Sequence, residues 1–328
     1  MQPISPQPGS AANPATFVGR RATTRLAREA LLDGIRLSLT DPRRMGKTYW
    51  MKYFCATTTD FAPVFIDYEG VRSAEEFMLR TAERLSRERS VPTRAKDLLK
   101  VLFDHVELSA GPIKVRPGMR SMAPTQLLAD IVLAVNDHAG QQPVLLCLDE
   151  VTLAIRNITN NDGAQTAREV LQTLRELQSN AERIRWIVCG SVGFHHVLRQ
   201  CQATEGDINE LNNLALGPLP VDEGSELAER LLMGTGRGYM PAAVPALMEG
   251  TGGIPYLMHK VASLMQYRAG AVSPGEVDQA VADFIADRDE PGGYALPDPT
   301  RPELRHRCIG GGQDPGQSRN GTGFDANR

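Results

Sequence analysis

The fold of this 328-residue chain is decided by one stretch, Leu37-Ser38-Leu39-Thr40-Asp41-Pro42-Arg43-Arg44-Met45-Gly46-Lys47-Thr48. The apolar run Ile35–Thr40 predicts a buried strand, and Tyr49–Cys55 predicts an amphipathic helical segment. A strand that turns sharply into a helix aims backbone N–H groups and the positive end of the helix dipole at one place. The stretch therefore predicts a loop that binds a polyphosphate.

Two side chains of this loop carry its chemistry. Lys47 would neutralise the β- and γ-phosphates of a nucleotide, and the Thr48 hydroxyl would bind Mg²⁺. The loop departs from the pattern GxxxxGK[ST] at its first position, where Asp41 stands instead of Gly. Asp tolerates unusual backbone angles better than most residues, but a carboxylate near the phosphates would weaken binding unless Arg43 and Arg44 offset it. The alternative interpretation is a chance Gly-Lys-Thr at a helix start.

Two more apolar runs end in polar residues. Val144–Leu148 is followed by Asp149 and Glu150, and Arg185–Cys189 is followed by a glycine and Ser191. Beside a phosphate loop, the first acid would hold Mg²⁺ or its water shell, and the second would polarise the attacking water. The Ser191 hydroxyl would touch the γ-phosphate or that water. The alternatives are a strand that ends in solvated acids and an ordinary Gly-Ser turn.

Strand-like and helix-like segments alternate over the first two thirds of the chain. This alternation predicts an α/β fold, a parallel sheet with helices on both faces. After Pro220 the strand pattern stops, and the sequence to about Ala286 predicts helices that are broken at Gly234–Gly238 and Gly250–Gly253. The other predicted strands are Val64–Tyr68 and Asn213–Leu216; the other predicted helices are Thr125–His138, Ala164–Ser179 and one capped by Ser73 that runs to about Arg89.

Shifts in composition predict the domain boundaries. The composition of residues 1–15, rich in Pro, Ser and Gln, predicts a disordered tail, and residues 16–219 are predicted to form the nucleotide-binding α/β domain with an insertion at 90–122. Residues 220–290 predict a small helical lid. Residues 291–328 lose all apolar periodicity and predict a disordered or aberrant tail, which a truncation or a shifted reading frame would explain.

Composition also limits the compartment and the partners. A net charge of −3 and a pI of about 6.1 argue against binding nucleic acid or anionic membrane by bulk charge. The first 15 residues lack the apolar stretch of a signal peptide, so none is expected, and no apolar run reaches about 20 residues. Five cysteines without CxxC spacing, of which Cys147 and Cys189 lie in apolar runs, predict reduced thiols in a cytoplasmic protein. The adjacent His195 and His196 lack metal-ligand spacing.

A basic patch in the insertion leaves nucleic acid open as a partner, although a solvated surface is favoured because acids are interspersed. Its basic residues are Lys96, Lys100, Lys114, Arg116 and Arg120.

Five motifs in order give the chain a family resemblance. They are Phe17-Val18-Gly19-Arg20, the phosphate loop, Leu148-Asp149-Glu150, Cys189-Gly190-Ser191 and Gly253-Ile254-Pro255-Tyr256. Over about Thr16–Asp287, the chain resembles the archaeal-ATPase-like group of AAA proteins. That group is related to the STAND switch ATPases and, more distantly, to origin-recognition-type initiators.

The resemblance implies a site for ATP and Mg²⁺. It implies that Phe17, Val18 and Arg20 flank the adenine, that Pro255 packs on the base or sugar, and that Ser191 acts as a sensor of the γ-phosphate. Glu150 and Lys47 would be catalytic, and Thr48 with Asp149 would hold Mg²⁺. The phosphates would lie against Pro42, Arg43, Arg44, Met45, Gly46, Lys47 and Thr48.

The function implied is an ATP-dependent switch with slow hydrolysis, whose output is signalling, regulation or defence. Its partners would be ATP or ADP and either another protein or a second copy of the chain. Arg183 and Arg185 are candidates for an arginine finger in cis, and a neighbouring subunit is the other source. Two alternatives stay open: a DNA-associated initiator-like ATPase, and a nucleotide-binding scaffold that does not hydrolyse.

Overall fold

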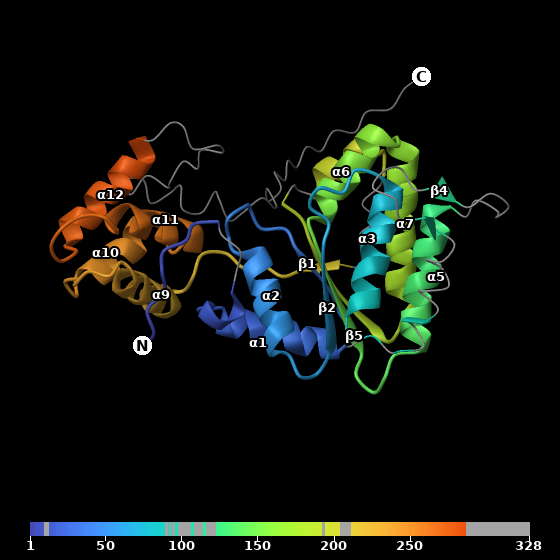
Figure 1. Ribbon diagram of the computed structural model, residues 1–328, viewed down its shortest axis with the longest axis horizontal. Coiled ribbons are helices and arrows are strands. Elements are labelled where there is room, and N and C mark those ends of the chain that lie inside the picture. The colour runs from blue at the N-terminus through green and yellow to red at the C-terminus, as the bar shows by residue number, and fades with distance from the viewer. Residues whose placement is uncertain are drawn as a thin grey trace, which may run out of the picture.

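The computed structural model describes residues 1–9, 13–88, 123–191, 194–203 and 211–286 (Figure 1). It also describes residues 91, 93, 96 and 97 and two short antiparallel strands, β3 (Val106–Glu107) and β4 (Lys114–Val115). Most of the predicted insertion at 90–122 and the predicted tail at 291–328 therefore lie outside the described residues.

Five parallel strands form the central sheet in the order β2-β5-β6-β1-β7. Because parallel neighbours run the same way, their carboxyl ends meet at one edge, and β6 places its end between those of β1 and β5. The predicted α/β parallel sheet is confirmed. The strands are β1 (Arg36–Leu39), β2 (Ala62–Asp67), β5 (Val144–Asp149), β6 (Ile184–Cys189) and β7 (Leu211–Asn213).

Helices cover both faces of the sheet, because successive side chains of the buried strands point to opposite faces. Leu146 and Leu148 of β5 pack toward one group of helices, and Leu145 and Cys147 pack toward the other. The first group is α3 (Ala74–Arg87), α5 (Pro124–Asp137), α6 (Val151–Asn161), α7 (Ala164–Asn180) and α8 (Phe194–Gln200); the second is α1 (Arg21–Leu32) and α2 (Lys47–Thr57). The burial predicted for Cys147 and Cys189 is confirmed, and both are free thiols.

One helix start and one strand end show how local signals succeeded and failed. Ser73 caps α3 as predicted, since its hydroxyl accepts a hydrogen bond from the N–H of Glu76 at 3.1 Å. The last strand is the exception, because β7 ends at Asn213 and the prediction of Asn213–Leu216 was wrong. The N–H groups of Leu216 and Gly217 bond to a side chain of the phosphate loop instead of a neighbouring strand.

Four helices after the sheet, in the segment for which a lid was predicted, share an apolar core of their own, and the name lid is kept for them. They are α9 (Val221–Gly234), α10 (Ala243–Gly250), α11 (Pro255–Met265) and α12 (Pro274–Ala286). Both predicted glycine breaks separate helices, and the break between α11 and α12 was not predicted. No helix among the described residues is both long and apolar enough to cross a membrane.

The start of the chain lies against the lid. Residues 1–15 predicted a disordered tail, but Ile4 is buried in the lid core and donates its N–H to the carbonyl of Arg230 at 2.9 Å. The N–H of Gln7 donates to Nδ1 of His259 at 3.2 Å. One branched aliphatic side chain among prolines and polar residues was a signal too short for periodicity to detect.

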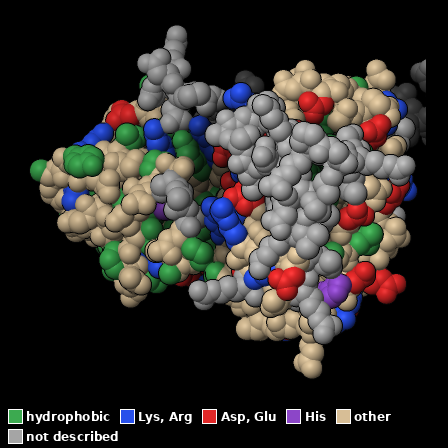
Figure 2. Space-filling view, turned by 45° about the vertical axis from the view of Figure 1, so that its right-hand side comes forward, with side chains coloured by type: hydrophobic (Ala, Val, Ile, Leu, Met, Phe, Trp, Pro, Cys, Tyr) green, Lys and Arg blue, Asp and Glu red, His purple; other side chains and the backbone are tan. Residues whose placement is uncertain are grey.

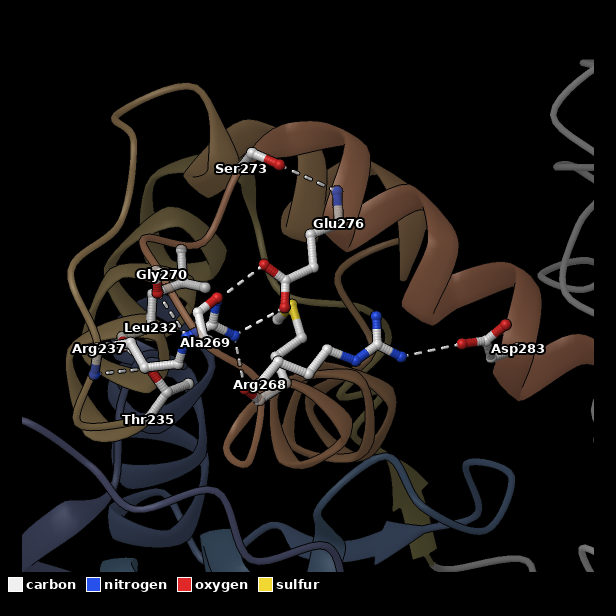
Figure 3. Close-up of polar contacts among 10 residues, drawn as sticks. Leu232, Thr235, Arg237, Arg268, Ala269, Gly270, Ser273, Glu276 and Asp283 are labelled. Atoms are coloured by element: carbon white, nitrogen blue, oxygen red, sulfur yellow. Dashed lines mark hydrogen bonds and ion pairs between the residues drawn. The ribbon is translucent and has the colours of Figure 1, made fainter.

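One arginine joins two loops of the lid (Figure 3). All five N–H groups of the Arg237 guanidinium donate hydrogen bonds: three to the carbonyls of Met265, Ala269 and Gly270 at 2.7–2.8 Å, and two to the carboxylate of Glu276 at 2.7 and 3.0 Å. The two charged side chains are only 9% and 15% exposed. The pair therefore fixes the loop before α10 to the start of α12.

We expect Arg237→Ala to lower the free energy of unfolding by about 3 kcal/mol, because it leaves three carbonyls and a mostly buried carboxylate without their donor. The control is Arg268→Ala in the same part of the lid. Arg268 pairs with Asp283 at 3.0 Å, but these side chains are 39% and 44% exposed, so its loss should cost less than about 1 kcal/mol. Denaturant titrations of both variants measure the difference, and equal losses would contradict the assignment.

Candidate functional site

The phosphate loop joins β1 to α2 and has the backbone of an anion-binding turn. Gly46 precedes α2 with a φ of 85°, a left-handed conformation that favours glycine, and Arg44 also has a positive φ, of 72°. The helix that follows carries Lys47 and Thr48 in its first turn, where the backbone N–H groups and the helix dipole attract anions. The predicted loop is therefore present, and Pro42 and Arg43 lie on its exposed side.

Lys47 points back into the loop. Its side chain is buried, and Nζ donates hydrogen bonds to the carbonyls of Asp41 at 2.6 Å and Pro42 at 2.9 Å. A buried ammonium group needs partners, and these carbonyls satisfy two of its three N–H donors. The ammonium group is thus held where the loop would enclose a phosphate.

The end of β5 meets the start of α2. The Thr48 hydroxyl donates to Oδ2 of Asp149 at 2.6 Å, and the other carboxylate oxygen accepts the N–H of Glu150 at 3.0 Å. Burial raises the pKa of Asp149 above its ordinary value, the Thr48 hydrogen bond opposes the shift, and the charges of Glu150 and Asp67 add to it. Such a carboxylate favours the approach of a cation.

The end of β6 contacts the second acid. Ser191 Oγ donates to Oε2 of Glu150 at 2.5 Å, and Glu150 itself has a left-handed backbone, with a φ of 56°, where β5 turns into α6. The strand order explains this contact, because β6 lies between β1 and β5. Ser191, which was expected to touch the γ-phosphate or the attacking water, is placed by the structure on the acid expected to polarise that water.

The oxygen atoms at this edge suit Mg²⁺. Magnesium prefers oxygen ligands and usually keeps several waters, so one hydroxyl and one carboxylate are a typical protein contribution. Thr48 Oγ1 and Asp149 Oδ2 are already in contact and lie next to the loop that would hold the phosphates. These two residues fit the predicted metal site.

The residues expected around the adenine lie in three different surroundings. The Phe17 ring stacks on Tyr53 and meets Tyr49 edge-on, with ring centroids 4.3 and 5.1 Å apart. Val18 is buried in the lid core. Arg20 reaches the backbone of the phosphate loop, since Nη2 donates to the Met45 carbonyl at 2.9 Å. The structure thus brings Phe17 to the outer side of α2 and turns Arg20 inward.

The lid approaches the loop near Pro255. Pro255 occupies the first turn of α11, where a proline is well tolerated. The next residue, Tyr256, lies under the Arg44 guanidinium, which is 4.2 Å from the centre of the ring. In the space-filling view, Lys and Arg side chains lie beside acidic ones where the lid meets the α/β domain (Figure 2).

The arginine-finger candidates lie at the wrong end of the sheet. Arg183 and Arg185 flank the start of β6, whereas the site is at its carboxyl end. Arg185 Nε donates to the Leu31 carbonyl at 2.7 Å, and Arg183 donates to the carbonyl of Gly140. Neither is an arginine finger in cis, because a strand's length separates them from the phosphate loop.

Three residues of the site region were missed or misjudged from the sequence. The Asp41 carboxylate points to the segment that leads into the lid, Glu223 of α9 is buried against the start of α1, and Tyr256 contacts Arg44. Each contact joins residues about 170 to 210 positions apart in the chain, so no local pattern reports it.

Comparison with solved structures agrees with this architecture. The Walker-type ATPase of Pyrococcus abyssi matches with a TM-score of 0.54 and 16% identity, over 82% of this chain and 73% of that one. Cdc6p from Pyrobaculum aerophilum matches with a TM-score of 0.51 and 15% identity, over 84% and 69%. No protein-family model and no curated protein matches the sequence. The chain therefore has the fold of the AAA+-like P-loop ATPases, as its motifs predict.

Proposed function

We propose that this chain is an ATP-binding switch of the AAA/STAND type that hydrolyses ATP slowly. The observation that carries the proposal is the hydrogen bond from Thr48 to Asp149, which joins the phosphate loop to the acid at the end of β5. Lys47 completes the set beside them. A hydroxyl, a carboxylate and an ammonium group in this arrangement are what a nucleotide triphosphate with its metal requires.

We assign the roles of the residues as follows. Lys47 would turn one N–H group from the loop carbonyls to the β- and γ-phosphates, and Thr48 with Asp149 would hold Mg²⁺. The metal would neutralise phosphate charge when bound. Glu150 would accept a proton from the attacking water after Ser191 releases its carboxylate. The need for that release supports slow turnover.

The contact between Ser191 and Glu150 also keeps a second candidate open. A protein in which this hydrogen bond persists with ATP bound would be a nucleotide-binding scaffold without hydrolysis. Phosphate release separates the two functions. We propose a cytoplasmic protein whose output passes through another protein or a second copy of the chain; a DNA-associated initiator is less favoured because the net charge is −3.

The first test is nucleotide binding. ATP with Mg²⁺, at about a hundred times its dissociation constant, should raise the free energy of unfolding by about 2.7 kcal/mol. Lys47→Ala should abolish the effect, whereas Lys52→Ala should retain it, because Lys52 lies on the same helix against the Phe65 ring. Thermal or denaturant unfolding with and without ATP measures both. An equal effect of ATP on Lys47→Ala and the parent would remove Lys47 from the site.

The second test separates the two acids. Glu150→Gln should retain ATP binding and lower the hydrolysis rate by about a hundredfold, because it removes the proton acceptor. Asp149→Asn should instead weaken the Mg²⁺-dependent part of binding. Asp33→Asn is the control, since Asp33 is an exposed carboxylate after α1, at the end of the sheet opposite the site. Phosphate release and titrations with and without Mg²⁺ give the answer; unchanged hydrolysis in both site variants would refute the roles assigned.

The third test concerns the base. Pro255→Ala and Phe17→Ala should weaken ATP and ADP binding by the same factor, because contacts to a base do not distinguish phosphate states. Titration with both nucleotides measures the ratio. A loss confined to ATP would place these residues near the γ-phosphate instead.

A further inference from the structure

Asp41 contacts two parts of the molecule at once. Its backbone carbonyl accepts a hydrogen bond from Lys47 Nζ at 2.6 Å, inside the phosphate loop. Its carboxylate faces the other way and accepts the N–H groups of Leu216 and Gly217, both at 3.0 Å. These two residues belong to the hinge, residues 214–220, which connects β7 to the first lid helix. Asp41 is thus a direct link between the loop and the lid connection.

The backbone does not require a glycine at this position. Positive φ angles occur in the loop at Arg44 and Gly46, and Asp41 is not among the described residues with a positive φ. A side chain is therefore accommodated without strain. The departure from the GxxxxGK[ST] pattern therefore adds a carboxylate to the loop without straining its backbone.

Arg20 supports the same hinge residue from the other side. Its guanidinium donates to the carbonyl of Leu216 and, at 2.9 Å, to the carbonyl of Met45 in the loop. The side chain is buried, and burial lowers the pKa of Arg20 to about 10, against the opposing charges of Asp41 and Glu223, so it remains a cation at neutral pH. Both backbone groups of Leu216 are therefore bonded to charged residues that also touch the loop.

The first lid helix also contacts the segment that contains Arg20. The buried carboxylate of Glu223, in the first turn of α9, accepts the N–H groups of Arg20 and, at 2.9 Å, of Arg21. Gly19 packs so near that a Cβ there would lie 2.9 Å from Glu223 Oε2. The N–H of Leu219 donates to the carbonyl of Gly253 in the lid at 2.8 Å. A shift of the hinge would therefore be passed on to the lid.

We propose that Asp41 is a positioning residue that, together with Arg20, makes the state of the phosphate loop set the position of the lid. The inference rests on the proposed function. Lys47 has three N–H donors, two of which serve the carbonyls of Asp41 and Pro42. A bound phosphate would accept one of these N–H donors, so the hydrogen bond to the Asp41 carbonyl would weaken or break. The Asp41 backbone would then shift, and its carboxylate would move the N–H groups of Leu216 and Gly217 that are bonded to it.

A competing account treats Asp41 only as a negative charge that repels phosphates. The two accounts differ in what Asp41→Asn and Asp41→Gly do. Loss of a positioning group uncouples the lid and does not tighten ATP binding, whereas loss of a repelling charge tightens ATP binding and leaves the lid response intact.

Hydrogen–deuterium exchange of the full chain tests the proposal, with the non-hydrolysable analogue AMP-PNP and Mg²⁺ as the probe. In the parent protein the analogue should slow exchange in the hinge and in α10 and α11. In Asp41→Asn, exchange at Leu216 and Gly217 should speed up by about tenfold, because Asn leaves at least one N–H without a carboxylate acceptor. Affinity for the analogue should not increase, and the lid should no longer respond.

Two further variants serve as a control and as a test of Arg20. Asp33→Asn makes the same chemical change at the exposed end of α1 and should behave as the parent. Arg20→Lys keeps the charge, but a single ammonium group does not span both carbonyls, so the lid response should again be lost. Melting curves without nucleotide verify that each variant is folded.

A lid that still responds in folded Asp41→Asn and Arg20→Lys would overturn the proposal. So would Asp41→Gly binding the analogue more than about tenfold tighter with an intact lid response, because that result supports repulsion. A parent protein that binds no nucleotide would refute the proposed function, and the inference with it, while a parent that binds without any lid response would refute the inference alone.

Discussion

Parallel pairing of β6 with β1 on one side and β5 on the other is the constraint on which the site depends. The order places three strand ends side by side, so that Thr48 after β1, Asp149 at the end of β5 and Ser191 after β6 meet at one edge. Residues separated by 101 and 41 positions in the chain thereby come within hydrogen-bond distance.

Burying the charges of Asp149 and Lys47 at this edge of the sheet costs free energy, and hydrogen bonds to neighbouring groups reduce that cost. Asp149 is 2% exposed and Lys47 is 6% exposed, and burial of either charge in an apolar sheet is unfavourable unless it is paired or hydrogen-bonded. Thr48 and the Glu150 N–H satisfy the carboxylate, and two loop carbonyls satisfy the ammonium group. The two buried charges are thus held at this edge by internal hydrogen bonds.

The lid is connected to the sheet mainly through polar contacts. Its apolar core is separate from the cores on the two faces of the sheet, so the two parts share little of the packing that would lock them together. The contacts at the hinge come instead from Asp41, Arg20 and Glu223. Hydrogen bonds are directional and can be exchanged one at a time, whereas an apolar interface has to separate as a whole.

The sequence by itself determined the α/β class, four of the five sheet strands, the phosphate loop and the two acids at the carboxyl end of β5. These features follow from local periodicity and from motifs whose residues are neighbours in the chain. Only the tertiary structure decided that Asp41 faces the hinge, that Ser191 contacts Glu150, that Arg183 and Arg185 lie at the far end of β6, and that Ile4 joins the lid core. The physical reason is that each of these facts depends on where a distant segment packs. The sequence offers each side chain several possible partners, and the order of the strands determines which of them lies within hydrogen-bond distance.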